Sequence, residues 1–260
     1  MKLQEILDKS FRLLRERPRM FIPNLISSII YAVFELVLIY YALDLIYSIS
    51  DINSVYGNIL PIIGLFLFYP LIGAIDLLTY GMYPSMVSDY HADRKINLLR
   101  SLKDSVKSWR ILLALGVIFL TFIVLLFVIV FFFFLLSMLL DEKMLIFLSF
   151  PVVLSLIVVL MMAVFFVVPA GVIEKKGVLS SFSNSFKLSS RYRWEVFTLI
   201  VFFMALVLAA ISLGSLVNLK EVEVGITLTA VLLFIMLRLI QSVLYTYISV
   251  VNPYFYLQRR

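Results

Sequence analysis

The sequence predicts an all-α integral membrane protein with six transmembrane helices, arranged as three repeats of an amphipathic helix plus a transmembrane helical hairpin. Hydrophobic residues make up 63% of the 260 residues, and the mean hydropathy is +1.09. Both values lie far outside the range of water-soluble domains. About 20 consecutive apolar residues cross a bilayer core. Six such stretches occur, near residues 21–45, 60–88, 110–139, 145–173, 195–217 and 224–257.

Three amphipathic segments, each placed directly before a pair of these stretches, predict the repeat. They align on Ser10, Ser105 and Ser185. Each serine has an apolar residue three positions before it, an apolar residue one position after it and a base two positions after it: Leu7, Phe11 and Arg12; Leu102, Val106 and Lys107; Phe182, Phe186 and Lys187. We therefore expect a single membrane domain with repeats at 1–90, 91–174 and 175–260. Convergent amphipathic segments at a membrane surface are the alternative.

Within each repeat, the pattern predicts a surface helix, an outward span, a short outer loop and a return span. Asn97 is expected to cap the second surface helix, and the serines of the third one are expected to face water. Residues 110–173 are so apolar that we expect them to contact lipid or to act as a packing scaffold. Each return span carries a proline near its cytoplasmic end, which predicts a kink that turns the chain into the next surface helix. These prolines are Pro84, Pro169 and Pro253.

The distribution of basic residues predicts a multi-pass protein of the cell membrane with both termini cytoplasmic. Of the 22 Lys and Arg residues, 19 lie in residues 1–20, 90–110, 174–193 and 259–260. By the positive-inside rule these segments are cytoplasmic. The opposite loops hold Lys143 and Lys220 and are otherwise acidic, with Asp44, Asp51, Asp141, Glu142, Glu221 and Glu223. We expect membrane lipids as partners, with anionic headgroups at the cytoplasmic face, and no nucleic acid, because the bases are dispersed around hydrophobic spans.

Polar residues at helical spacing on the first, second and sixth spans predict a cytoplasm-facing polar cleft. Helical rise places Asp76 about 24 Å, Arg238 about 21 Å and Glu35 about 15 Å from the outer ends of their spans. Ionisable groups at this depth are costly and usually face a partner or a wet cavity. We expect them to form the charged floor of the cleft. The candidate residues are Arg238, Asp76, Glu35, Asn24, Tyr31, Tyr80, Tyr83, Gln241, Tyr245 and Asn252.

Two functions are compatible with this pattern. In the first, the cleft binds or moves a small anionic solute, ion or lipid headgroup; Arg238 meets the anionic group, and Asp76 or Glu35 supplies charge balance or proton coupling. In the second, the chain is a structural or partner-binding membrane module, with a homo-oligomer as one form. Its buried charges would then fix helix packing through an ion pair between Asp76 and Arg238.

Catalysis finds little support in the sequence. His91 is the single histidine and lies in a charged segment, cysteine is absent, and no His/Cys metal-site spacing occurs. We therefore expect a non-enzymatic protein without cofactor or metal.

The segment SFSNSFKLSSRYRW, which follows VVPAGVIEKKG, and the opening ILDKSFRLLRERPRMFIPNLI resemble a known membrane domain. It is the one associated with glycerophosphodiester phosphodiesterases and with related uncharacterised archaeal membrane proteins. In the fused relatives, catalysis belongs to a separate soluble domain with paired histidines and metal-binding carboxylates. This sequence has no such residues. The resemblance therefore implies a membrane module and not phosphodiesterase activity.

Overall fold

The computed structural model confirms an all-helical protein with six helices long and apolar enough to cross a bilayer. It describes residues 3–47, 52–140, 144–215 and 228–260, and no strand occurs within these ranges. The candidate spans are Pro18–Ala42, Ile59–His91, Trp109–Leu140, Ile146–Glu174, Arg193–Ser212 and Val231–Arg259. They match the predicted stretches closely. The loop residues Asp51, Asp141, Glu142, Lys143, Lys220, Glu221 and Glu223 lie outside the described residues, so their side of the membrane stays a prediction.

The long helices form three hairpins, each preceded by a short helix. Helix α2 (Ile22–Tyr47) pairs with α3 (Ile52–His91), α5 (Trp109–Leu140) with α6 (Met144–Val164), and α9 (Arg193–Ser215) with α10 (Leu228–Arg259). The short helices are α1 (Leu3–Glu16), the 3-10 turn η1 (Pro18–Phe21), α4 (Leu98–Lys107), α7 (Val167–Glu174) and α8 (Val178–Arg191). As predicted, Asn97 caps α4, because its side-chain oxygen accepts a hydrogen bond from the Arg100 backbone N–H at 3.1 Å.

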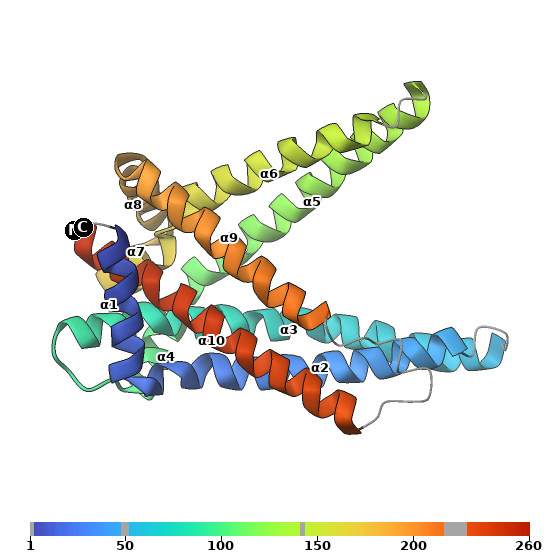
Figure 1. The fold of residues 1–260 in the computed structure, drawn as a ribbon, viewed down its shortest axis with the longest axis horizontal. Coiled ribbons are helices and arrows are strands. Elements are labelled where there is room, and N and C mark those ends of the chain that lie inside the picture. The colour runs from blue at the N-terminus through green and yellow to red at the C-terminus, as the bar shows by residue number, and fades with distance from the viewer. Residues whose placement is uncertain (1–2, 48–51, 141–143, 216–227) are drawn as a thin grey trace.

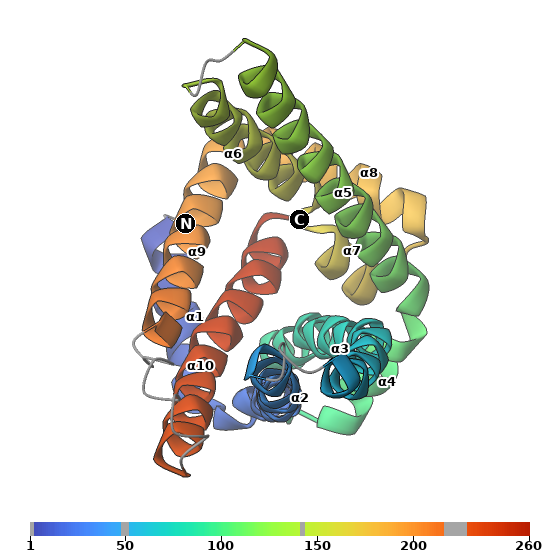
Figure 2. The ribbon, with the colours of Figure 1, turned by 90° about the vertical axis from the view of Figure 1, so that its right-hand side faces the viewer.

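The short helices and both termini gather at one end of the molecule, which we call the short-helix end (Figure 1). From this end the hairpins diverge, and the α5–α6 hairpin points well away from the other two (Figures 1 and 2). The largest apolar core lies where the hairpins converge, and its fully buried members include Leu13, Met20, Tyr83, Phe166 and Phe255. In α5, by contrast, the 18-residue window that defines the span has no buried residue. The expectation that this segment faces lipid therefore agrees with its exposure.

Three of the short helices, α1, α4 and α8, pack on a long helix of another hairpin through a face that carries serines. Helix α1 contacts α10, α4 contacts α3, and α8 contacts α6 and α7. Ser10, Ser105 and Ser185 are all completely buried. The residues that follow them, Phe11, Val106 and Phe186, are 64%, 48% and 62% exposed. In all three segments the aligned serine is therefore buried and the residue after it is exposed.

The prediction that the serines of the third surface helix face water holds for Ser180, Ser183 and Ser190, which are exposed, and is wrong for the other three. Ser181, Ser185 and Ser189 are buried, whereas Leu179 and Phe186 are exposed. The physical reason is that a serine is small enough for close helix contact and can donate its hydroxyl hydrogen to a backbone carbonyl. Ser185 Oγ donates to the Ala163 carbonyl at 2.8 Å, and in α4 Ser105 Oγ donates to the Leu78 carbonyl at 2.6 Å.

The prolines do not turn the chain into the next surface helix as predicted. Helix α3 continues past Pro84 to His91, and α10 continues past Pro253 to Arg259. Near Pro169 the helix breaks earlier, between the end of α6 at Val164 and the start of α7 at Val167. Proline lacks an N–H, so the carbonyl four residues before it loses its helical donor. Here that carbonyl belongs to Phe165, and it accepts a hydrogen bond from Asn252 Nδ2 at 2.7 Å.

Gly81 on α3 marks the closest approach of α4. A Cβ at this position would overlap Ser105 Oγ and lie 3.0 Å from Leu112 Cδ1, whereas a Cβ at Gly73 on the same helix would have no neighbour within 4 Å. Gly81→Ala should therefore destabilise the protein by ~1–3 kcal/mol, because Ser105 must abandon its bond to Leu78 or α4 must shift. Gly73→Ala, the matched control, should leave stability unchanged or raise it. Thermal unfolding in one detergent measures both, and equal effects would contradict this account of the α3–α4 contact.

Candidate binding site

A cavity of about 430 Å³ lies between α2, α3, α9 and α10. Eight of the ten predicted site residues line it: Asn24, Tyr31, Glu35, Asp76, Tyr80, Arg238, Gln241 and Tyr245. Its other lining residues are Ser27, Ser28, Leu77, Val207, Ile248 and Ser249. The sequence pattern therefore finds most of a site whose residues are up to 225 positions apart, Asn24 and Ser249 being the extremes. They meet because α2, α3 and α10 pack against one another.

Helical periodicity explains why these side chains share one cavity. On α2, Asn24, Ser28, Tyr31 and Glu35 follow steps of three and four residues, which align side chains along one helix face. Helix α10 presents Arg238, Gln241 and Tyr245 by the same rule. Helix α9, whose sequence shows no polar face, contributes only the apolar side chain of Val207.

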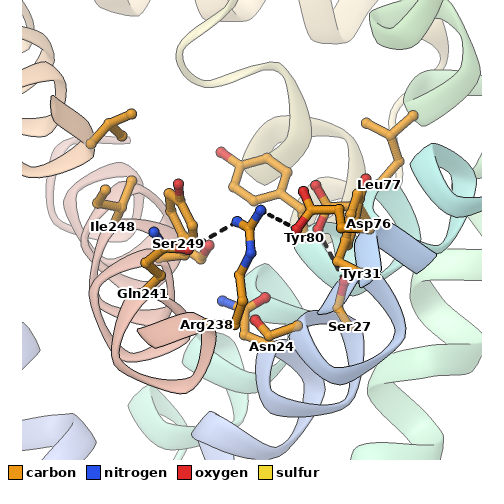
Figure 3. Close-up of a pocket in the computed structure, with 14 residues that line it drawn as sticks. Asn24, Ser27, Tyr31, Asp76, Leu77, Tyr80, Arg238, Gln241, Ile248 and Ser249 are labelled. Atoms are coloured by element: carbon orange, nitrogen blue, oxygen red, sulfur yellow. Dashed lines mark hydrogen bonds and ion pairs between the residues drawn. The ribbon is translucent and has the colours of Figure 1, made fainter. Parts of the chain in front are cut away.

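Arg238 reaches from α10 into the cavity (Figure 3). It forms an ion pair with Glu35 of α2. Its other terminal nitrogen donates to Gln241 Oε1 at 2.9 Å. The Arg238 and Glu35 side chains are 28% and 29% exposed. The expected pair between Arg238 and Asp76 is therefore wrong. Depth counted along each helix from its own outer end misjudges which groups meet, because the helices diverge and their ends do not lie at one level.

Asp76 lies on the α3 side of the same cavity, close to Ser27 and Tyr31 (Figure 3). Ser27 Oγ donates to Asp76 Oδ1 at 3.2 Å. Among the described residues Asp76 has no ion pair, and the residue is exposed rather than buried. The cavity thus holds one neutralised charge pair and one carboxylate supported by a hydroxyl group alone.

Tyr83 and Asn252, the two other predicted site residues, do not line the cavity but support it. Tyr83 is fully buried, and its hydroxyl donates to the Met20 carbonyl at 3.2 Å. Asn252 Nδ2 donates to the Tyr80 hydroxyl at 2.9 Å and to the Phe165 carbonyl at 2.7 Å. Asn252 therefore holds the cavity-lining phenol of Tyr80 against the break between α6 and α7.

Side chains become more buried from the level of Glu35, Asp76 and Arg238 toward the short-helix end. The expected cleft that opens at that end is therefore not present in the described residues. Along α3, Asp76 is exposed, Tyr80 is half-buried and Tyr83 is completely buried. Along α2, Glu35 is partly exposed and Asn24 is buried. The reason is that large side chains of the convergent core, Tyr83 among them, fill the space that polar periodicity alone predicted to be wet.

Sequence reasoning missed several contributors. Ser27 lies three residues after Asn24 and four before Tyr31, so its spacing was compatible with the same helix face. Nothing in the sequence pattern pointed to Thr246, yet its hydroxyl accepts a hydrogen bond from Asn24 Nδ2 at 3.1 Å. Gln241 Nε2 donates to the Ala210 carbonyl of α9 at 2.7 Å, and a backbone acceptor leaves no trace in side-chain patterns.

No group of three His, Cys, Asp or Glu side chains able to hold a metal occurs in the described part of the chain. His91 lies at the end of α3 with its ring 4.9 Å from that of Tyr254, well away from the cavity-lining set. Comparison with protein-family models, curated proteins and solved structures gives no match. The family resemblance stays a prediction.

The observed pairing predicts which charges are energetically coupled. In a double-mutant cycle, Glu35→Leu and Arg238→Met should show an interaction of ~1–3 kcal/mol, below the value for a fully buried pair because both side chains keep partial exposure. Asp76→Leu combined with Arg238→Met should be additive within ~0.5 kcal/mol. Thermal stability in one detergent–lipid mixture measures both cycles. Coupling confined to Asp76 and Arg238 would refute the observed pairing.

Proposed function

We propose that this chain is a non-enzymatic, multi-pass protein of the cell membrane that binds or moves a small charged solute, ion or lipid headgroup through the cavity between α2, α3, α9 and α10. The observation that carries the proposal is the meeting of Arg238, Glu35 and Asp76 in one cavity inside the candidate spans. A charged side chain inside such a span costs at least ~2.5 kcal/mol and usually marks a solute or ion pathway.

The size and lining of the cavity support a small-molecule site. Its volume of about 430 Å³ falls within the range of ~300–1,000 Å³ that is usual for ligand pockets. Its lining combines apolar side chains with a few charged and hydrogen-bonding groups, which is the composition that orients a bound molecule. The family resemblance and the lack of a recognisable catalytic set support a role without catalysis or cofactor.

Blocking the cavity should abolish solute binding. Ser28 lines the cavity, whereas the neighbouring Ile29 is 49% exposed on the outside of α2. A panel of small ammonium, carboxylate and phosphate salts should include a member that raises the thermal stability of the parent, because a ligand of the folded state stabilises it. Ser28→Trp should remove that effect, and Ile29→Trp, the matched control, should retain it. Flux of the same solute into liposomes then separates transport from binding.

If no charged solute stabilises the parent in a way that depends on Ser28, the binding function is wrong. The second candidate function, a structural or partner-binding module that includes a homo-oligomer, would then be favoured. Its supporting observation is the contact set of α10, in which Arg238 pairs with Glu35 of α2 and Gln241 bonds to Ala210 of α9. These polar contacts tie three spans together without a ligand.

We further propose that the three units at 1–90, 91–174 and 175–260 are repeats closed into a ring. Each short helix packs on the return span of the preceding unit, and α1 packs on α10 of the last unit. The carbonyl acceptors of Ser105 and Ser185, Leu78 and Ala163, each lie six residues before the proline of their span. This equivalence supports common descent over convergent surface segments.

The positive-inside rule supports an orientation with the short-helix end in the cytoplasm. The exposed bases Arg12, Lys107 and Lys187 each follow an exposed apolar residue on a short helix. This arrangement suits an amphipathic helix at the level of anionic headgroups, with the apolar side chain in lipid and the base beside phosphate.

The absence of cysteine in this sequence permits a clean test of orientation. Single substitutions Ser190→Cys, at the short-helix end, and Ser50→Cys, in the first predicted outer loop, should differ in labelling by a membrane-impermeant maleimide. In intact cells we expect labelling of Ser50→Cys alone, and after permeabilisation labelling of both. The reverse pattern would invert the proposed orientation.

A further inference from the structure

We infer that the ligand of the cavity is a small organic cation whose ammonium group lies against the Asp76 carboxylate, an inference that rests on the proposed binding function. It replaces the anionic solute expected from the presence of Arg238 in the sequence. The contacts that Arg238 and Asp76 make in the cavity lead to this choice.

Arg238 is poorly placed to receive an anion, because its guanidinium group is already engaged. One terminal nitrogen pairs with Glu35, and the other donates to Gln241. The guanidinium carbon also lies 5.5 Å from the centre of the Phe234 ring, within cation–π range. An incoming anion would have to displace Glu35 and leave that carboxylate without its partner inside a membrane span.

Asp76, in contrast to Arg238, is well placed to receive a ligand of opposite charge. Within the described residues its carboxylate accepts one hydrogen bond, from Ser27, although an ionised carboxylate offers about four acceptor positions. Since Glu35 and Arg238 neutralise each other, Asp76 in its ionised form is the source of net negative charge among the lining residues. The residue is exposed at the cavity, so an entering cation can reach it without breaking an ion pair.

The remaining polar lining suits an organic cation rather than a bare ion. Tyr31, Tyr80 and Tyr245 all line the cavity, and phenol rings attract ammonium groups. The Tyr80 hydroxyl accepts a hydrogen bond from Asn252, so its own hydrogen can be donated to an oxygen of the ligand. A volume of about 430 Å³ is also many times the ~30 Å³ that one water occupies in the liquid.

Three probes of nearly the same shape separate charge from size. They are choline chloride, its uncharged analogue 3,3-dimethylbutan-1-ol and the anion sodium 3,3-dimethylbutanoate. We expect choline to raise the thermal stability of the purified protein and to bind in calorimetry, and the other two to have no effect. Dihexanoylphosphatidylcholine, which carries the same ammonium group on a lipid, tells a headgroup source from a free solute: stronger binding than choline would assign the site to lipid.

Asp76→Asn should weaken choline binding by about tenfold or more, since it removes the negative charge that attracts the quaternary ammonium group while keeping an oxygen for Ser27. Asp76→Glu should restore most of the affinity. Asp93→Asn, the same chemical change at an exposed turn with φ of 55°, is the matched control and should bind like the parent. The unliganded melting temperature of each variant verifies folding.

The outcomes separate a failure of the cation assignment from a failure of the proposed binding function. Binding of the carboxylate probe but not choline, or choline binding that is unchanged in Asp76→Asn, would overturn the cation assignment and leave a cavity that binds solutes. Failure of all three probes, together with failure of the wider panel to show Ser28-dependent stabilisation, would overturn both.

Discussion

The structure depends on one constraint, the need of every backbone polar group in a membrane span to find a partner inside the protein. At the break between α6 and α7 this requirement is met by two side chains from elsewhere in the chain. Ser185 of α8 accepts the Phe166 N–H at 3.0 Å and donates to the Ala163 carbonyl, and Asn252 of α10 donates to the Phe165 carbonyl. The break between α6 and α7 is therefore the place where the second hairpin is hydrogen-bonded to α8 and to α10.

The same chemistry recurs at α4, where Ser105 Oγ donates to the Leu78 carbonyl of α3. Buried serines dock the short helices onto long ones at close range, and apolar side chains of α1, α3, α9 and α10 fill the space between them. Beyond this convergence the hairpins separate, and their outer parts are left to lipid (Figure 2). The cavity lies just beyond the packed end, where three spans remain close enough to share polar contacts but no longer fill the space between them.

Most of the fold was predictable, because hydropathy and helical spacing are properties of single segments. The spans, the helices α1, α4 and α8, and eight of the fourteen residues that line the cavity follow from such local patterns. Contacts between segments were harder. Arg238 has two carboxylates within the same cavity, and only the relative tilt of α2, α3 and α10 decides that Glu35 is its partner. Ser185 of α8 was wrongly expected to face water, because polarity alone does not reveal that a hydroxyl group can satisfy a carbonyl of a neighbouring helix.

The position of Asn252 has a consequence for the hairpin that stands apart. Helices α5 and α6 contribute no residue to the cavity lining, and α5 is almost wholly apolar. Yet the single amide nitrogen of Asn252 binds both Tyr80, inside the cavity, and the Phe165 carbonyl, at the base of this hairpin. One side chain therefore bonds both to the lining of the cavity and to the break at which α6 ends, so the cavity and the most exposed hairpin share one amide group.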